Sequence, residues 1–214
     1  MEIKELSYIF AAKIQFLRFN FGLIIMTRYS FADFGTIIAD SYGIAKSHGF
    51  HAEDANRCTE HFIMLIVSEL GEVIEADRKG KCCDLGIFDD AFRTVPFKEA
   101  FETYVKDSIG DEFADIVIRL ADLCGVVGVR IEPSAMDDEF EEDFGDYTFT
   151  ECAFVLNHIL VSGTSVDDDL EQRLGSALSF VIAWCHHLGI DLEEHVSLKM
   201  AYNDLRPMLN GKRY

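Results

Sequence analysis

The strongest constraint on the fold is a helical spacing of apolar residues that recurs along most of the chain. Long stretches place apolar side chains at positions i, i+3 and i+4, which share one face of an α-helix, whereas the alternation typical of strands is scarce. Only 3 prolines occur in 214 residues, so few positions interrupt these stretches. The sequence predicts an all-α protein with helices near 33–48, 55–78, 98–128, 148–162, 168–188 and 191–206.

Breaks between these helices are marked by glycine, proline and charged residues. The sequence SHGFH (47–51) separates the first two helices, and GTSVDD (163–168) provides a tight link. Two longer loops are expected, at 79–97 with Pro96 and at 129–147 with Pro133 and an acidic run. The length suits a single domain with a substantial core.

The overall charge limits the partners of the chain. A formal charge of −19 argues against a nucleic-acid-binding protein, which needs a basic face. An acidic protein can still bind a nucleotide if a metal ion and a few basic side chains offset the phosphate charge locally. Six cysteines without a CxxC pattern or framework spacing favour reduced thiols, a cytoplasmic location and no zinc site.

Residues 1–26 form an N-terminal extension whose structure the sequence does not define. They are apolar and aromatic, but Lys13, Arg18 and Asn20 interrupt any run long enough to cross a membrane. A signal peptide stays possible, although a clear cleavage site is lacking. We therefore expect no membrane partner and a main domain over 27–214.

Two acidic pairs interrupt the apolar helical pattern. Glu69 and Glu72 in SELGEV, and Glu112 and Asp115 in DEFADI, are each spaced i, i+3, which puts both members on one helix face. A single such pair is usually a solvated surface. Two pairs on neighbouring helices bring four carboxylates together, and these favour a hard divalent cation such as Mg²⁺, with Mn²⁺ as a substitute. Glu75 or Asp122 could then accept a proton from an activated water.

A basic stripe lies in the C-terminal segment. Lys199, Asn203 and Arg206 are spaced i, i+4 and i+7 on one helix face before Pro207 ends the helix. Two cations and an amide suit the oxygens of a di- or triphosphate, and Lys212 in the tail could add a third cation. The alternative is a helix C-terminus whose cations complement the helix dipole.

A weak internal similarity relates two predicted helix ends. CGVVGVRIE (124–132) aligns with CHHLGIDLE (185–193) at an offset of 61 residues. The acidic pair of the first segment has no counterpart in the second. Chance similarity between amphipathic helices explains the match as well as an internal duplication does.

Together, SELGEV, DEFADIVIRLADLCG and GIDLEEHVSLKMAYNDLRPMLNGKRY resemble the MazG-like branch of the all-α NTP pyrophosphatases. The pattern of that family is ExxE, then ExxD on the next long helix, then K-x-x-x-N-x-x-R before a G-K tail. The resemblance covers about residues 33–128 and 189–214. It implies a four-helix bundle that assembles as a homodimer or higher homo-oligomer and, with Mg²⁺, hydrolyses a nucleoside triphosphate to the monophosphate and pyrophosphate.

The resemblance also assigns roles residue by residue. It implies that Glu69, Glu72, Glu112 and Asp115 bind the metal and serve catalysis. It implies that the phosphates contact Lys199, Asn203, Arg206, Lys212 and Tyr214. Base recognition falls near the first two helices, where Asn56 and His61 are candidates, although His61 also fits an ordinary helix histidine.

Two departures from the family pattern affect the substrate rather than the chemistry. The two acidic pairs are separated by a long loop at 79–106, and residues 130–188 insert two extra helices before GIDLEE. These helices could cover the site, replace a subunit contact or bury the oligomer surface. The alternative function is a helical bundle that binds a nucleotide or a protein partner without catalysis.

Overall fold

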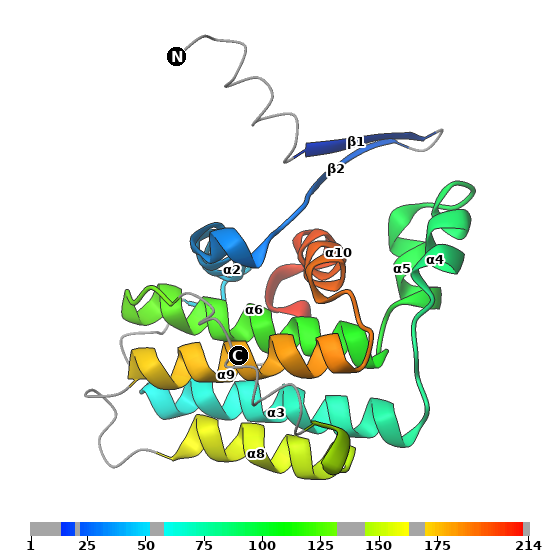
Figure 1. The fold of residues 1–214 in the computed structure, drawn as a ribbon. Coiled ribbons are helices and arrows are strands. Elements are labelled where there is room, and N and C mark those ends of the chain that lie inside the picture. Colours follow the sequence, from blue (N-terminus) through cyan, green and yellow to red (C-terminus); the bar gives the residue numbers. More distant parts are fainter. Residues whose placement is uncertain (1–13, 20–21, 52–57, 132–143, 163–169, 212–214) are drawn as a thin grey trace, which may run out of the picture.

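The prediction of an all-α fold is confirmed by the computed structural model, which describes residues 14–19, 22–51, 58–131, 144–162 and 170–211 (Figure 1). The helices are α2 (Phe34–Ser47), α3 (Thr59–Arg78), α4 (Leu85–Phe92), α5 (Phe97–Tyr104), α6 (Ile109–Val127), α8 (Phe149–Val161), α9 (Leu170–His187) and α10 (Leu192–Asp204). Before them, β1 (Ile14–Phe19) and β2 (Gly22–Thr27) form an antiparallel hairpin in which Ile14 pairs with Thr27.

Helix α6 is the central element of the fold. It packs against α3 and α9 on one side and against α2 and α10 on the other, and α8 contacts both α3 and α9 (Figure 1). In the view of Figure 1, α3, α6, α8 and α9 run side by side, while α2 and α10 are seen almost end-on above α6. A helix that is covered on several sides must be apolar around most of its circumference, and α6 meets this requirement.

Helices α8 and α9, which the sequence analysis assigned to an insertion, share the main hydrophobic core. Trp184 on α9 is buried and meets Phe113 of α6 edge-on, with ring centroids 4.9 Å apart. Phe149 at the start of α8 lies 4.7 Å from the same indole. The residues from 144 onward therefore complete the core around α3 and α6.

A second aromatic cluster holds α4 and α5 against α10, and it corrects the prediction of a loop at 79–97. Asp84 caps α4 by accepting hydrogen bonds from the N–H groups of Gly86 and Ile87. Four phenylalanines, at 88, 92, 97 and 101, are buried in this cluster. Phe101 stacks on Tyr202 of α10, with ring centroids 4.4 Å apart.

The predicted helix 98–128 is wrong in one respect, because the chain breaks it into α5 and α6. Asp107, between the two helices, has φ 62°, which a continuing α-helix cannot contain. The Ser108 hydroxyl then caps α6 by accepting a hydrogen bond from the N–H of Asp111, 3.3 Å away. The break turns α6 so that its N-terminal turn faces α10.

The internal similarity corresponds to two helix ends of the same kind. Gly128 after α6 and Gly189 after α9 adopt φ of 76° and 70°, the left-handed conformation that glycine accepts most readily. In both, the next residue's N–H donates to a cysteine carbonyl five residues earlier, Val129 to Cys124 and Ile190 to Cys185. This end motif is common in helices, so it explains the similarity without an internal duplication.

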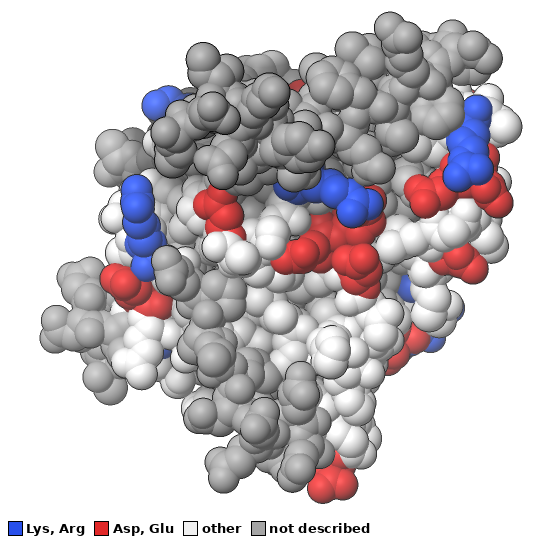
Figure 2. Space-filling view, turned by 45° about the horizontal axis from the view of Figure 1, so that its top comes forward, with Lys and Arg blue, Asp and Glu red and all other residues white. Residues whose placement is uncertain are grey.

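On the face shown in Figure 2, acidic side chains form the larger coloured patches, and basic side chains lie beside them. Within the described parts of the chain, no helix has the length and apolar character needed to cross a membrane.

Candidate metal centre and adjoining pocket

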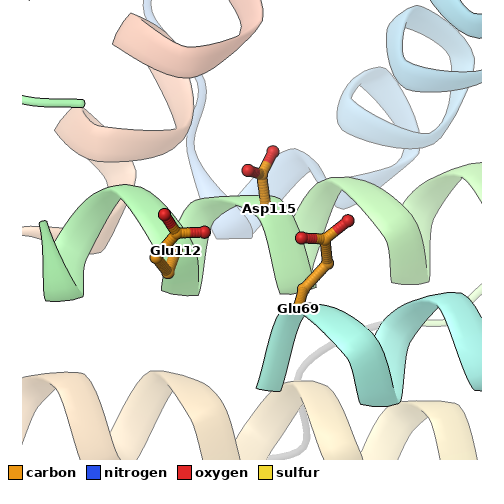
Figure 3. Close-up of side chains that lie close together, drawn as sticks. All are labelled: Glu69, Glu112 and Asp115. Carbon is orange, nitrogen blue, oxygen red and sulfur yellow. The ribbon is translucent and has the colours of Figure 1, made fainter. Parts of the chain in front are cut away.

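Three of the four predicted metal ligands converge where α3 packs against α6. Glu69 projects from α3, and Glu112 and Asp115 project from adjacent turns of α6 into the same region (Figure 3). One potential ligand atom from each residue lies within 4.8 Å of those from the other two. Oxygens on opposite sides of a single Mg²⁺ are separated by about 4 Å, so a small inward movement of the side chains would let one cation contact all three.

The fourth predicted ligand, Glu72, is exposed and lies outside this group. Three residues turn an α-helix by about 300°, which leaves the two positions about 60° apart, so Glu72 lies at the exposed edge of the face whose buried part carries Glu69. A glutamate side chain has enough rotatable bonds to turn toward its neighbour one helical turn away. Glu72 therefore stays a predicted ligand that the observed arrangement does not include.

The chemistry of the cluster fits a hard cation. All three groups offer carboxylate oxygens, the donors that Mg²⁺ and Mn²⁺ prefer. Burial, followed by repulsion from Asp115, raises the pKa of Glu112 to about 8 even though Lys199 opposes this shift. The site therefore concentrates more negative charge than its surroundings stabilise, and a bound divalent cation would relieve it.

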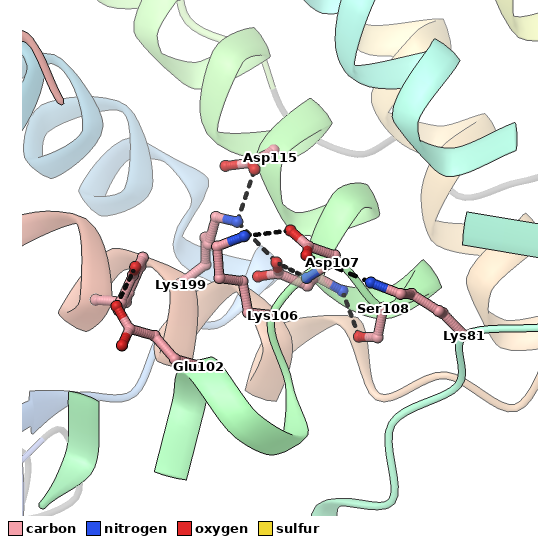
Figure 4. A network of polar contacts seen from close by, with 9 residues as sticks. Lys81, Glu102, Lys106, Asp107, Ser108, Asp115 and Lys199 are labelled. Carbon is pink, nitrogen blue, oxygen red and sulfur yellow. Dashed lines mark hydrogen bonds and ion pairs between the residues drawn. The ribbon is translucent and has the colours of Figure 1, made fainter. Parts of the chain in front are cut away.

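Two basic side chains pair with the cluster. Arg119 Nε lies 3.2 Å from Glu69 Oε1. Lys199 Nζ lies 2.7 Å from Asp115 Oδ2, a contact drawn in Figure 4. Lys199 Nζ also lies 2.9 Å from Asp111 Oδ2. Fully ionised, Glu69, Asp111, Glu112 and Asp115 carry four charges against the two cations, so a divalent ion that displaces the Glu112 proton would neutralise the remaining −2.

Asp111 is a buried acidic residue of this network that the sequence analysis did not single out. Its Oδ2 accepts hydrogen bonds from Lys199 and from the N–H of Asp107, while its Oδ1 is buried without a hydrogen-bond partner among the described residues. Burial raises its pKa to about 6, against the influence of Lys199. Burial alone would lower the pKa of Lys199, but Asp115 and Asp111 together raise it, so the ammonium stays charged.

A pocket of about 70 Å³ adjoins the cluster between α2, α6 and α10. A single water needs about 10–15 Å³ measured in this way, so the pocket admits a hydrated ion or part of a larger ligand. Its charged and polar lining comes from separate helices and includes Glu69, Asp115, Arg119, Asp122, Asn203 and Arg206. Carboxylates and cations thus face the same space.

The three residues of the predicted basic stripe lie in two different environments. Lys199 is directed at carboxylates, whereas Asn203 and Arg206 line the pocket. Asn203 Oδ1 is buried and has no hydrogen-bond partner within the described structure. The Arg206 guanidinium lies 5.8 Å from the centre of the Tyr202 ring. The partly exposed guanidinium would pair with the anionic part of a ligand, while the unpaired amide oxygen would accept from one of its hydroxyl or N–H groups.

Most of the other residues that the sequence suggested for the site do not line this pocket or are not described. Asn56, Lys212 and Tyr214 lie outside the described residues. His61 packs edge-on against Phe62 at 5.3 Å and does not line this pocket. Glu75 forms ion pairs on the surface with the basic residues at 78 and 79.

Asp122 is the second proton acceptor that the sequence suggested, and it is buried at the wall of the pocket. His51 Nε2 lies 2.8 Å from Asp122 Oδ1 and donates to it. The His51 ring also stacks between Tyr42 and Phe62. Because His51 lies 71 residues from Asp122, spacing along the sequence gave no sign of this pair.

Comparison of the chain with protein-family models, curated proteins and solved structures found no match. The class of the protein is described from its own fold and site. It is an all-α protein with a buried carboxylate cluster beside a pocket that is lined in part by cationic side chains.

Proposed function

We propose that this protein is a Mg²⁺-dependent nucleoside triphosphate pyrophosphohydrolase of the MazG-like kind. The observation that carries the proposal is the convergence of Glu69, Glu112 and Asp115 beside a pocket that also presents Asn203 and Arg206. A metal-binding group next to phosphate-binding groups is what a nucleotide substrate requires. The order of the acidic pairs and the basic stripe along the chain supports the same class.

In the proposed reaction, the carboxylates hold the metal and the α10 side chains hold the phosphates. Bound there, Mg²⁺ would polarise a phosphoryl oxygen and lower the pKa of an attacking water. The water oxygen forms a bond to the α-phosphorus, the bond from that phosphorus to the α,β-bridging oxygen breaks, and pyrophosphate departs. Arg206 and Asn203 stabilise the charge that develops on the departing pyrophosphate. We assign the water's proton to Asp122, which lines the pocket and is oriented by His51.

Pyrophosphate release from a panel of ribo- and deoxyribonucleoside triphosphates with Mg²⁺ tests the proposal. We expect turnover by the wild-type protein and a loss of at least about 100-fold in Glu112→Gln and Asp115→Asn, since each change removes a charged ligand. Glu60→Gln, an exposed change on the same helix as Glu69, is the matched control and should retain full activity. Near wild-type turnover in both ligand variants contradicts the proposal.

The second candidate is a non-catalytic nucleotide-binding bundle, which a specific observation favours. Lys199 and Arg119 already pair with Asp115 and Glu69, so part of the charge of the cluster is neutralised by the protein itself. Such a protein would bind a triphosphate with Mg²⁺ yet release no pyrophosphate from any member of the panel. Equilibrium binding measured beside turnover separates the two functions.

A further inference from the structure

The segment that follows α10 folds back onto the C-terminal end of α2. The N–H of Leu209 donates to the carbonyl oxygen of His48 at 2.9 Å. In the opposite direction, His48 Nε2 lies 2.8 Å from the carbonyl oxygen of Arg206. These two contacts connect residues about 160 positions apart and cross one edge of the pocket, which both His48 and Arg206 line.

Both ring nitrogens of His48 lie within hydrogen-bond distance of a backbone carbonyl oxygen, Nδ1 2.9 Å from that of Ile44 and Nε2 2.8 Å from that of Arg206. The Ile44 oxygen also accepts from the Ser47 hydroxyl and from the backbone N–H of His48, so Nδ1 contributes little that the end of α2 lacks. A carbonyl oxygen can only accept, so the contact with Arg206 requires a proton on Nε2, and this is the long-range bond.

The backbone next to His48 is shaped for the same contact. Gly49 has φ 84°, a conformation that side-chain-bearing residues rarely adopt. A Cβ at this position would also lie 3.0 Å from the terminal methyl of Met208. The Met208 methyl ends a flexible side chain and can move, so the main cost of a larger residue at 49 is the strained backbone, and relief of that strain would shift the turn that carries His48.

We infer that His48 is a positioning residue that docks the segment after α10 and thereby holds Arg206 at the substrate phosphates. Without this contact, the described residues after Asn203 keep the Leu209 amide bond and apolar packing as their attachment to the end of α2. Arg206 follows the last helical residue, Asp204, so its position depends on where this segment lies. The inference rests on the proposed hydrolase function for its kinetic consequence, while the docking itself is independent of that function.

The test replaces His48 with glutamine or asparagine, whose side-chain amides stand in for different nitrogens of the imidazole. The side-chain nitrogen of Gln reaches about as far as Nε2, and that of Asn about as far as Nδ1. His48→Gln should keep the bond to Arg206 and raise KM less than about threefold, whereas His48→Asn should lose it and raise KM about five- to tenfold. Gly49→Ala, which leaves the imidazole unchanged, should raise KM in the same way. His158→Gln, at an exposed histidine on α8, is the control.

Amide hydrogen exchange at Leu209 measures docking without any reference to activity. Exchange should be faster in His48→Asn and Gly49→Ala and close to wild type in His48→Gln. Stabilisation by Mn²⁺ should be unchanged in all variants, because His48 does not belong to the carboxylate group. Equal exchange or equal KM in the Gln and Asn variants overturns the inference. Absence of turnover in the wild-type protein overturns the hydrolase function instead, and exchange at Leu209 still decides whether His48 docks the segment.

Discussion

His195 is a buried histidine on α10 that packs against the first turn of α6. A Cβ added to Gly110 would lie 2.4 Å from His195 Nε2, so the ring rests directly on the glycine backbone. Burial lowers the pKa of His195 to about 4; Asp191 opposes this shift, and Lys199 adds to it. The other titratable groups that share its pocket are Asp77, Cys82, Cys83 and Asp84.

This shift predicts a loss of stability in mild acid. Between pH 6.5 and 4 the unfolded chain binds a proton at this histidine and the folded chain does not, so unfolding becomes easier as the pH falls. At about 1.4 kcal/mol per pKa unit, the full loss is about 3 kcal/mol and is complete near pH 4. Urea unfolding of the wild type and of His195→Gln across this range measures it.

The substituted protein should show a flatter dependence of unfolding free energy on pH than the wild type. His158→Gln, which changes an exposed histidine, should keep the wild-type slope. Parallel curves for all three proteins would show that the pKa of His195 is the same in the folded and the unfolded states.

At the residue scale, the sequence located the acidic pairs but not the network around them. Glu112 and Asp115 share a helix face because they are three residues apart, and this rule needs only the sequence. The position of the Lys199 ammonium between Asp111 and Asp115 depends on how α10 packs against α6, 88 residues away from Asp111. Asp111 itself looks like an ordinary first-turn acid, a position that acidic residues favour on any helix.

At the element scale, local signals explain both the success and the errors of the helix prediction. The apolar spacing of α3, α6 and α9 extends over 18 to 20 residues each, long enough to dominate any local preference. Helix α4 has only 8 residues in a stretch with glycine and aspartate, so composition suggested a loop. The i, i+4 spacing of Phe88 and Phe92 was the available signal for a helix.

The crossing of α2 over α6 depends on a glycine. A Cβ at Gly125 of α6 would lie 2.6 Å from Cβ of Tyr42 on α2, an atom that side-chain rotation cannot move. We expect Gly125→Ala to destabilise the protein by about 1–3 kcal/mol, as overpacked sites do, and to disturb the Tyr42 contact with His51. Thermal or urea unfolding measures the change.

Gly43 on α2 provides the matched control for this substitution. Its Cβ position has no atom within 4 Å, so Gly43→Ala should stabilise the helix by about 0.5–1 kcal/mol. Opposite signs for the two glycines support the close helix contact. Destabilisation of equal size at both would indicate that α2 is sensitive to substitution in general.

At the scale of the whole molecule, the helices after residue 144 enlarge one core rather than form a separate unit. Trp184 joins α6, α8 and α9 through its contacts with Phe113 and Phe149. Helical periodicity predicted α8 and α9, but periodicity does not reveal which helices share a core. The expected homodimer or higher homo-oligomer stays a prediction, which light scattering in solution can test.

The carboxylate cluster links metal binding to the stability of the whole fold. Its residues come from two helices that are far apart in the chain and form the site only when α3 and α6 are packed. A cation that binds this folded arrangement and not the unfolded chain must stabilise the protein by mass action. The size of that effect is independent of whether any nucleotide is hydrolysed.

We expect Mn²⁺ at about 100 times its Kd to stabilise the wild-type protein by about 2.7 kcal/mol, which corresponds to a rise in Tm of about 5–10 °C for a chain of this size. Glu112→Gln should lose this rise. Without metal its Tm should equal or exceed that of the wild type, because burial and then Asp115 disfavour a charged carboxylate at this position and the amide carries no charge. Calorimetry with and without Mn²⁺ measures both values, with Glu60→Gln as the control that keeps the full rise. An equal rise in Glu112→Gln and wild type would place the metal elsewhere, and a lower metal-free Tm would show that Glu112 supports the fold rather than the ion.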